Sequence, residues 1–267
     1  MINVIITAPR GAMDSLIVQE CAKHPEINVV ACVGTPGAEY IGKDAGSVAG
    51  CGGEIGALIY DSIEAEVTDE NGNPATLIDL CDVVVDYSRI ELSMEVLEAC
   101  VKHGKALLCG TTGFSEEQLA GFAEAAKQIP VMQTANTSYV VTVMRKLLTE
   151  AAELLGDKAG IEIIEAHSDT KLDAPSGTAI EMANAMVASS SKTSADITFH
   201  SVRAGNTPSS HHVLFGCRGE MMQITHDAYD WRCYAIGACD GVVFLADKLA
   251  QGAGGTGKVY TMDDVIA

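Results

Sequence analysis

Short apolar runs and stretches with helical spacing alternate through the first half of the chain. The apolar runs predict β-strands over residues 3–7, 28–32, 82–86, 106–109 and 131–133. The spacing of apolar residues between these runs predicts helices over residues 15–23, 92–102 and 115–127. Ser115 is placed to cap the last of these helices. Strands and helices in this order form a doubly wound parallel sheet, so we expect a Rossmann-like α/β domain as far as about residue 134.

Residues 34–56 interrupt this alternation. The segment is rich in glycine and shows neither helical nor alternating periodicity. We therefore predict a long loop system beside the sheet, of the kind that often carries function in compact domains.

The pattern changes again after residue 136, where a second, α+β domain is expected. Helices are predicted over residues 143–155 and from a Pro-Ser-Gly-Thr turn to about residue 188, with a strand over 161–166 between them. Antiparallel strands are predicted over residues 197–202, 210–215 and 221–226, with a further strand near Cys233. A last helix is predicted over residues 241–249.

Composition and charge exclude several classes of protein. Apolar residues make up 48% of the chain and charged residues 20%, without the roughly 20-residue apolar run that a membrane helix needs. The first apolar run lacks the features of a secretory signal, so we expect a soluble cytoplasmic protein. The net charge of −19 repels nucleic acid and anionic membranes from most of the surface. A site for a small anion must therefore gather its own positive charge.

The cysteines indicate neither a metal site nor a disulfide framework. There are nine, an odd number, and they are scattered without a Cys-x-x-Cys pair. Several lie inside apolar runs, where cysteine behaves as a small hydrophobic residue. We therefore expect reduced thiols that fill the core, and no bound metal.

The turn after the first strand lies where a dinucleotide diphosphate would meet the N-terminus of a helix. Of the glycines that such a turn requires, only Gly11 is present, and Asp14 would bring a carboxylate close to the phosphates. The alternative is an ordinary turn in which Asp14 caps the helix. The acidic residue that would hold an NAD ribose is also missing, because the second strand is followed by Gly34 and Thr35, so this region does not indicate the cofactor.

A second glycine-containing loop follows the strand at residues 106–109. Gly110, Thr111, Thr112 and Gly113 place flexible backbone and two hydroxyl groups at the edge where α/β sheets bind ligands. This loop could line a nicotinamide ribose, and it could equally be a simple turn.

The most specific segment lies at residues 165–178. His167 and Lys171 bracket a polar loop, and Ser176, Gly177 and Thr178 then begin a helix. The free N–H groups and the dipole of such a helix start favour a carboxylate, while lysine supplies a cation and a transferable proton. A lone histidine is more often structural, but its place beside this helix start favours a functional role for His167.

This segment resembles the Glu-x-His-His-x-x-Lys-x-Asp-Ala-Pro-Ser-Gly-Thr signature of the dihydrodipicolinate reductase family, whose members are also called 4-hydroxy-tetrahydrodipicolinate reductases. The likeness extends over nearly the whole chain. It includes residues 42–46, 85–88, 103–105, 110–114, 135–136, 202–205, 224–226 and 260–265.

The resemblance implies a fold and an activity. A Rossmann-like dinucleotide-binding domain would comprise residues 1–135 with 233–267, and a central domain, residues 136–232, would bind substrate and form a homotetramer, with hinge closure between the domains. The implied reaction is the reduction, by NADPH or NADH, of a cyclic imine dicarboxylate to tetrahydrodipicolinate in lysine and diaminopimelate biosynthesis.

The resemblance also implies roles for individual residues. Lys171 and His167 match the catalytic positions, and either could donate the proton. Substrate-binding positions correspond to Ser168, Ser176, Gly177 and Thr178. Positions in contact with the cofactor correspond to Gly11, Met13, Ser88, Gly110, Thr111, Thr112, Ala135 and Asn136. For the second carboxylate of the substrate we expect His167, with His211 or His212, although these paired histidines could equally lie in a solvated loop.

Several positions depart from the family pattern. Ser168 replaces the second histidine of the signature and can form a hydrogen bond but carries no charge. In the phosphate loop, Ala8, Ala12 and Asp14 replace a glycine, an arginine and a glycine, and Gly34 replaces the ribose-facing acid. Two alternatives therefore remain open: a related imine reductase with another substrate, and a non-catalytic ligand-binding relative.

Overall fold

The computed structural model describes residues 1–69, 71–252 and 256–267. The chain separates into two compact units, Met1–Ser138 with Arg232–Ala267 (unit 1) and Tyr139–Trp231 (unit 2). Each unit has hydrophobic clusters of its own, two in unit 1 and one in unit 2.

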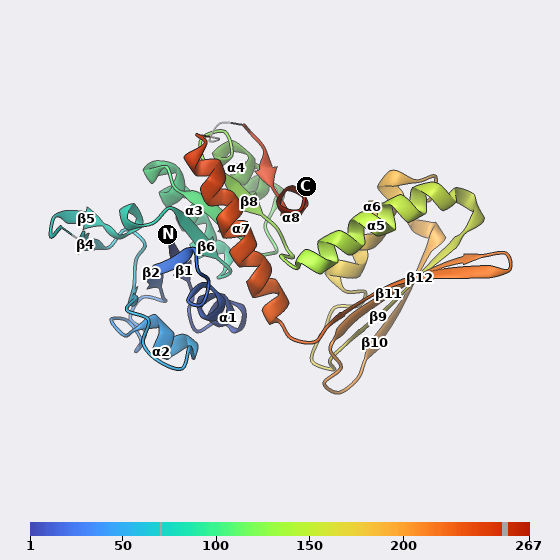
Figure 1. The fold of residues 1–267 in the computed structure, drawn as a ribbon, viewed down its shortest axis with the longest axis horizontal. Coiled ribbons are helices and arrows are strands. Elements are labelled where there is room, and N and C mark those ends of the chain that lie inside the picture. The colour runs from blue at the N-terminus through green and yellow to red at the C-terminus, as the bar shows by residue number, and fades with distance from the viewer. Residues whose placement is uncertain (70, 253–255) are drawn as a thin grey trace. The chain divides into compact units, whose positions relative to one another are not determined.

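Unit 1 is built on a seven-stranded parallel sheet (Figure 1). Its strands are β1 Ile2–Thr7, β2 Ile27–Val33, β3 Leu58–Tyr60, β6 Val83–Asp86, β7 Ala106–Cys109, β8 Val131–Gln133 and β13 Val259–Tyr260. They are arranged in the order β13-β8-β7-β6-β1-β2-β3, and each neighbouring pair is parallel. This order is that of a doubly wound dinucleotide-binding sheet, and the predicted Rossmann-like α/β class is confirmed.

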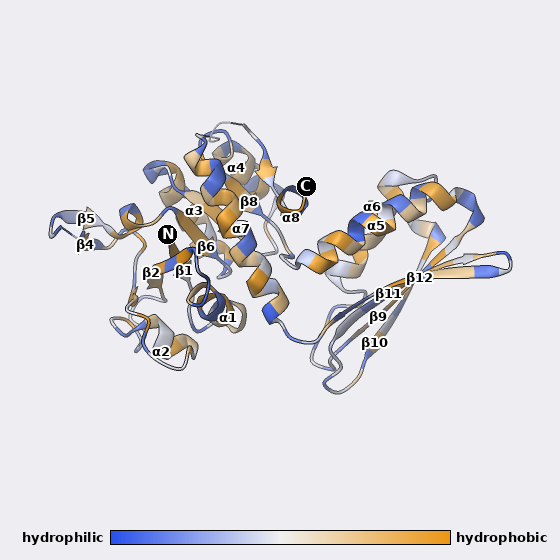
Figure 2. Ribbon diagram, in the orientation of Figure 1, coloured by the Kyte–Doolittle hydropathy of each residue, from blue (hydrophilic) through white to orange (hydrophobic). Residues whose placement is uncertain are grey.

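Helices cover both faces of this sheet. They are α1 Ala12–Cys21, α2 Ala45–Ala49, α3 Ile90–His103, α4 Glu116–Ala125, α7 Arg232–Ala250 and α8 Met262–Val265, and a 3-10 turn spans Leu77–Leu80. Side chains of successive strand residues point to opposite faces. Val4 and Ile6 thus join the cluster that contains residues of α1 and α7, whereas Ile5 joins the cluster beneath α3 and α4. In Figure 2 apolar residues, coloured orange, recur along α7 and on β6.

Local sequence signals explain part of this arrangement. Ser115 caps α4 as predicted: its hydroxyl accepts from the backbone N of Gln118 at 3.3 Å, and the Gln118 side chain accepts from the backbone N of Ser115 at 2.8 Å. Six of the nine cysteines are buried, which confirms the prediction that cysteine fills core positions.

For unit 1, one prediction was right only in part and another was wrong. Residues 34–56 contain the short helix α2, whose N-terminus is capped by the Asp44 side chain accepting from the backbone N of Ser47 at 3.1 Å. A five-residue helix is too short to show a periodic pattern. Cys233 lies in α7 and not in a strand, and this helix begins well before residue 241. Glycines hide the helical pattern there, yet Gly241 is needed, because a Cβ atom would lie 2.7 Å from a methyl carbon of Leu108.

The sequence signals also missed short elements. They include β3, β13, the short helix α8 and the hairpin of β4 Glu66–Thr68 with β5 Pro74–Thr76. Strands of two or three residues show little alternation, and among the described strands of this length only β8 was predicted.

Unit 2 packs two helices against one face of a four-stranded sheet. Its elements are α5 Tyr139–Leu155, β9 Gly160–His167, α6 Gly177–Ser189, β10 Ile197–Arg203, β11 Ser209–Cys217 and β12 Glu220–Ala228, with 3-10 turns at Gly156–Lys158 and Ser194–Asp196. The strand order is β10-β9-β11-β12. Ile161 and Ile163 are buried with residues of α5 and α6, which confirms an α+β arrangement.

One strand direction was predicted wrongly. Strand β10 is parallel to β9, whereas β11 and β12 are antiparallel as expected. The cause is α6, which follows β9 and leads into β10, since a helical connection returns the chain in the same direction. Within the described ranges, no helix combines the length and apolar character needed to cross a membrane.

Candidate active site

Strands β1 and β6 are neighbours at the point where the strand order of unit 1 reverses. Ligands of α/β sheets bind beyond the carboxyl ends of the strands at this point. Asp86, the last residue of β6, is fully buried there, and Thr7, the last residue of β1, donates from its hydroxyl to Asp86 at 2.7 Å.

Asp86 gathers further hydroxyl groups around its carboxylate. Ser88 donates to it at 2.5 Å and Thr111 at 3.2 Å, and the hydroxyl of Ser93 donates as well. Two predicted cofactor residues from different loops, Ser88 and Thr111, are thereby held together.

A pocket opens beside these residues. It is lined by Ser88, Arg89, Gly110, Thr111 and Thr112, together with Tyr87, Ile90 and Glu91. Gly110 has a structural role as well, because a Cβ atom there would lie 2.1 Å from the ring of Tyr87. The Tyr87 hydroxyl donates to Thr137 at 3.0 Å.

The carboxyl end of strand β8 lies at the same edge of the sheet as the carboxyl ends of β6 and β7. Gln133 donates from its side chain to the carbonyl of Thr111 at 3.4 Å. Ala135 and Asn136 follow directly, and the Asn136 side chain accepts from the backbone N of Ser138 at 2.8 Å. The predicted cofactor residues of this segment therefore lie beside the loop that carries Thr111.

Gly11 and Met13 lie at the start of α1, and Asp14 occupies its first turn. Gly11 is the N-cap, so the alternative that Asp14 caps the helix was wrong. The Asp14 residue is only 3% exposed, and its Oδ1 atom has no hydrogen-bond partner in the described part of the chain. Burial, and the nearby charge of Asp86, raise the pKa of Asp14 to about 8. At neutral pH this side chain is mainly the uncharged acid.

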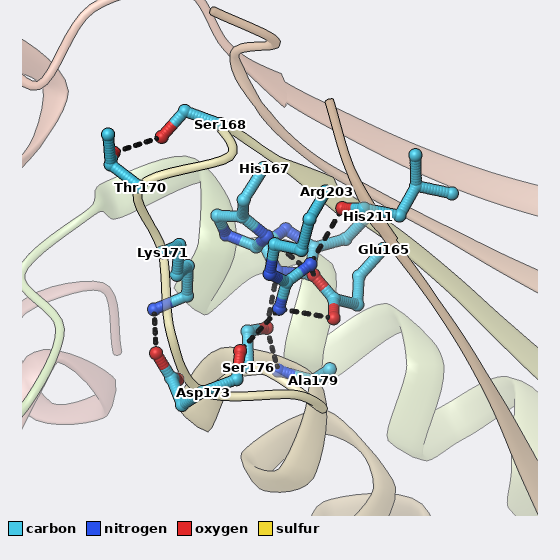
Figure 3. A network of polar contacts seen from close by, with 11 residues as sticks. Glu165, His167, Ser168, Thr170, Lys171, Asp173, Ser176, Ala179, Arg203 and His211 are labelled. Atoms are coloured by element: carbon cyan, nitrogen blue, oxygen red, sulfur yellow. Dashed lines mark hydrogen bonds and ion pairs between the residues drawn. The ribbon is translucent and has the colours of Figure 1, made fainter. Parts of the chain in front are cut away.

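In unit 2, His167 ends strand β9 and contacts a buried carboxylate. Its Nδ1 atom lies 2.5 Å from Oε2 of Glu165, a residue with no solvent exposure. Figure 3 shows His167 and Arg203 both directed toward Glu165. Arg203 donates from its two terminal nitrogens to the two oxygens of Glu165, at 2.9 and 2.8 Å.

Burial and neighbouring charges set the protonation of this histidine. Burial lowers the pKa of His167, and the positive charges of Lys171 and Arg203 act in the same direction, against the opposing effect of Glu165. His167 is therefore neutral at neutral pH in the free protein.

The loop after β9 carries Lys171. Its Nζ atom lies 2.9 Å from Oδ1 of Asp173, and the Lys171 side chain is 31% exposed. Ser168 and Thr170 share a hydrogen bond of 2.8 Å between their hydroxyl groups on the far side of this loop (Figure 3).

The loop ends at the N-terminus of α6. Ser176 is the N-cap and accepts from the backbone N of Ala179 at 3.2 Å. Gly177 and Thr178 form the first turn, and a Cβ atom added to Gly177 would meet no described atom within 4 Å. The N–H of Gly177 helps to lower the pKa of the Asp173 carboxylate through a hydrogen bond, so this helix start already attracts an anion, as a carboxylate site requires.

The paired histidines lie in strand β11, so the alternative of a solvated loop was wrong. His211 is 1% exposed, with its ring 5.4 Å from that of His167 and its Nε2 atom 3.2 Å from the hydroxyl of Ser176. Burial and neighbouring histidines lower the pKa of His211 to about 4. His212 points to the opposite face, where Gln223 lies 3.0 Å from its Nδ1 atom. A positive charge on His211 is thus not available at neutral pH.

Comparison with known proteins decides the family. The model described as "Dihydrodipicolinate reductase, N-terminus" matches residues 2–137, and "Dihydrodipicolinate reductase, C-terminus" matches residues 140–266. The chain belongs to the dihydrodipicolinate reductase family. As expected from the sequence, it is an oxidoreductase of a family that uses NADH or NADPH, and the Rossmann unit is the part that binds the dinucleotide.

Solved structures share the fold at low identity. A dipicolinate-bound dihydrodipicolinate reductase from Paenisporosarcina sp. TG-14 is 22% identical, with 98% of this chain and 97% of that chain covered and a TM-score of 0.75. A putative myo-inositol dehydrogenase from Sinorhizobium meliloti 1021 is 10% identical, with coverage of 96% and 94% and a TM-score of 0.61. GenD2 from gentamicin A biosynthesis, in complex with NAD, is 12% identical, with coverage of 99% and 90% and a TM-score of 0.59.

The departures from the dihydrodipicolinate reductase pattern can now be placed in the structure. Ala8, at a glycine position of the family, has a φ angle of 46° and occupies the left-handed region that glycine tolerates more readily. Asp14 is neutral near pH 7, so its presence in α1 is compatible with a bound diphosphate. With Ser88 and Thr111 held by Asp86, the residues at this edge fit a dinucleotide.

Sequence reasoning assigned no role to Glu165 and Arg203, which the structure brings together with His167. A usable signal was present, because Glu165 and His167 are two residues apart on a strand and must point to the same face. Arg203 lies on another strand, and its contact with Glu165 becomes evident only when β9 and β10 are paired.

Proposed function

We propose that this protein is a 4-hydroxy-tetrahydrodipicolinate reductase, which reduces a cyclic imine dicarboxylate to tetrahydrodipicolinate with NADH or NADPH, in lysine and diaminopimelate biosynthesis. The observation that carries the proposal is the grouping of Lys171, His167 and the N-terminus of α6 in one part of unit 2. The reductase from Paenisporosarcina binds dipicolinate, a dicarboxylate whose six-membered ring has the size of the ring in the proposed substrate. This ligand supports the choice of a cyclic dicarboxylate as substrate.

Lys171 and the α6 start form the proposed carboxylate site. Gly177 and Thr178 provide backbone N–H groups at the positive end of the helix dipole, and Ser176 shapes the turn. Ser168, hydrogen-bonded to Thr170 on the far side of the loop, lies apart from this group (Figure 3). The Lys171 ammonium adds a positive charge beside this helix start, against the net charge of −19 of the whole chain.

We assign proton donation to Lys171 and orientation of the substrate to His167. The lysine ammonium carries protons that it can donate, whereas His167 is neutral in the free protein. The alternative, donation by His167, requires the negative charges of the substrate to raise the pKa of its ring.

The residues that would hold the dinucleotide are those at the carboxyl edge of the unit 1 sheet. Ser88, Gly110, Thr111 and Thr112 line one pocket, Ala135 and Asn136 adjoin it, and Gly11 and Met13 begin α1. When bound, the dinucleotide supplies the hydride for the reduction.

We also propose a cytoplasmic homotetramer assembled through unit 2. Exposed apolar side chains on its strands, Val202, Met221 and Met222, support an interface between copies. Nine cysteines in a chain of this size suit a reducing compartment. Light scattering would measure the mass of the assembly.

The direct test is a spectrophotometric assay. Purified protein should oxidise NADH or NADPH only when the condensation product that yields 4-hydroxy-tetrahydrodipicolinate is supplied, and the product should be tetrahydrodipicolinate. Binding of both nucleotides without turnover would favour a related reductase with another substrate. The non-catalytic alternative predicts that neither nucleotide binds, which fluorescence titration would detect.

A further inference from the structure

Glu165 is a fully buried carboxylate that links strands β9 and β10 of unit 2. His167 and Arg203 both contact its oxygen Oε2, at 2.5 and 2.9 Å, and Arg203 also donates to Oε1 at 2.8 Å. The Nη2 atom of Arg203 also donates a hydrogen bond to the backbone carbonyl of Asp173 at 2.5 Å. The side-chain carboxylate of Asp173 in turn forms an ion pair with Lys171. A single guanidinium therefore connects the histidine and the lysine of the proposed site.

The sheet fixes the positions of these side chains. Strands β9 and β10 are parallel, with Arg203 paired with His167 and Ser201 paired with Glu165. Beyond the strands, the backbone N of Ala204 donates to the carbonyl of His167 at 3.2 Å. The three side chains thus project from rigid backbone and not from a mobile loop.

Glu165 carries a negative charge in this setting. Burial acts to raise its pKa, but hydrogen bonds from Arg203, Ser201 and His167 outweigh burial and lower the pKa below the ordinary value of 4.5. A buried ion pair is costly to desolvate and is often no more stable than apolar residues of the same size. Stability alone therefore does not account for this pair.

A carboxylate at this position determines which nitrogen of His167 holds the proton. An ionised carboxylate only accepts hydrogen bonds, so neutral His167 must carry its hydrogen on Nδ1 to form the contact. Its Nε2 atom is then left as the acceptor nitrogen. Carboxylates that orient a histidine in this way act on metal ligands and on catalytic bases alike.

We propose that Glu165 and Arg203 are positioning residues of the reduction site: Glu165 fixes the Nδ1–H form of His167, and Arg203 holds Glu165 and the loop that carries Lys171 in one geometry. The consequence for catalysis rests on the proposed function, whereas the protonation pattern of His167 does not.

The experiment is nitrogen NMR of the full chain labelled at histidine, combined with steady-state kinetics. Wild-type His167 should show a protonated Nδ1 and an unprotonated Nε2 at neutral pH. In the double variant Glu165→Leu/Arg203→Met, which removes both buried charges together, His167 should lose this preference. The value of kcat should fall by about 10- to 100-fold, as for other residues that orient a functional histidine, while KM for the dinucleotide stays within about twofold.

The chain offers a matched control on the same strand. Glu162 lies 2.6 Å from Nε2 of His200 on the other face of β9, where both side chains are about half exposed. Glu162→Leu should leave the His167 signals and kcat unchanged. An equal loss of kcat in this control would overturn the proposal, since any glutamate of β9 would then have the same effect.

Other outcomes are equally decisive. A wild-type His167 with its proton on Nε2 contradicts the proposal before any kinetics are measured. Should the double variant fail to fold, Glu165→Gln removes the charge at nearly constant size. The pKa of His167 should then fall below its wild-type value, and an unchanged titration would overturn the inference. Absence of turnover in the wild type would count against the proposed function alone.

Discussion

Two buried side chains favour their uncharged forms and respond to pH in opposite directions. Asp14, in α1, has its pKa raised to about 8, while His211, in β11, has its pKa lowered to about 4. Both shifts have burial as their largest cause, because a low-dielectric interior disfavours whichever form carries the charge.

We expect Asp14→Asn to stabilise unit 1 at neutral and alkaline pH. The folded-state pKa of Asp14 lies above its usual value of 3.8, so the folded protein loses stability as the pH rises between 3.8 and about 8. Asparagine has nearly the same shape but carries no charge. The gain in unfolding free energy should be on the order of 3 kcal/mol at pH 7 and should shrink toward pH 5. Urea unfolding across this range would measure it, and a pH-independent difference would contradict ionisation as the cause.

The opposite dependence is expected of His211. Its folded-state pKa of about 4 lies below the usual 6.5, so the unfolded chain takes up a proton first and stability falls as the pH drops from 6.5 toward 4. Between pH 7 and pH 5 this group should cost about 2 kcal/mol. His211→Asn retains a polar group near Ser176 but cannot be protonated. The acid-induced loss of stability should therefore be smaller in the variant, and parallel curves would show that His211 does not titrate as expected.

Lys171→Ala should separate catalysis from stability. The side chain is partly exposed and its ion pair with Asp173 lies on a loop, so the unfolding free energy should change by less than about 1 kcal/mol. Loss of the cation and proton donor should lower kcat by about 100-fold or more. Unchanged kinetics would exclude the assigned role.

How far the site could be predicted depends on the distance along the sequence over which its contacts form. His167, Lys171 and the α6 start lie within one short segment and could be grouped from their spacing. The partnership of Arg203 with Glu165 spans 38 positions and depends on strand register, which single-sequence patterns do not specify. The neutrality of Asp14 and His211 depends on burial in the folded state, and no local signal encodes it.

At the scale of elements, the predictions were accurate wherever an apolar pattern was long and uninterrupted. Strand β6 is buried along its whole length and reads as a valine run, so its identity was evident. Helix α7 was recognised only in part, because the buried residues Gly237 and Gly241 interrupt its apolar pattern, and at Gly241 the helix packs closely on Leu108. The direction of β10 could not be derived from its residues, since the preceding helix determines it.

The residues near the end of β2 suggest that the protein discriminates only weakly between NADH and NADPH. Gly34 follows this strand where an acid would contact an NAD ribose, and Arg10, a candidate for the 2′-phosphate of NADPH, lies 3.1 Å from Glu39. We therefore expect specificity constants for NADH and NADPH to differ by less than about 100-fold, or roughly 2.7 kcal/mol. Glu39→Gln should release Arg10 and improve the constant for NADPH relative to NADH. A larger wild-type ratio would indicate a contact elsewhere.

At the scale of the whole molecule, a net charge of −19 opposes the binding of any anion. A preference for two carboxylates must therefore arise from local groups, namely Lys171 and the start of α6 for one of them. Pyridine-2,6-dicarboxylate should compete with substrate and bind at least about tenfold more tightly than pyridine-2-carboxylate, since one additional charge-assisted contact contributes about 1.4 kcal/mol. Equal inhibition constants would favour a reductase with a different substrate.

Unit 1 is made of two separate segments of the chain, and this affects how it folds during synthesis. Val4 and Ile6 of β1 belong to the same buried cluster as Ala235, Val242 and Leu245 of α7. Translation completes all of unit 2 before it delivers α7, so the part of this face that α7 covers stays exposed until α7 has left the ribosome, although α1 packs on the same face. An N-terminal fragment ending at Ser138 therefore lacks this cover and is prone to aggregate, which makes the protein dependent on full-length synthesis in a way that a contiguous Rossmann domain is not.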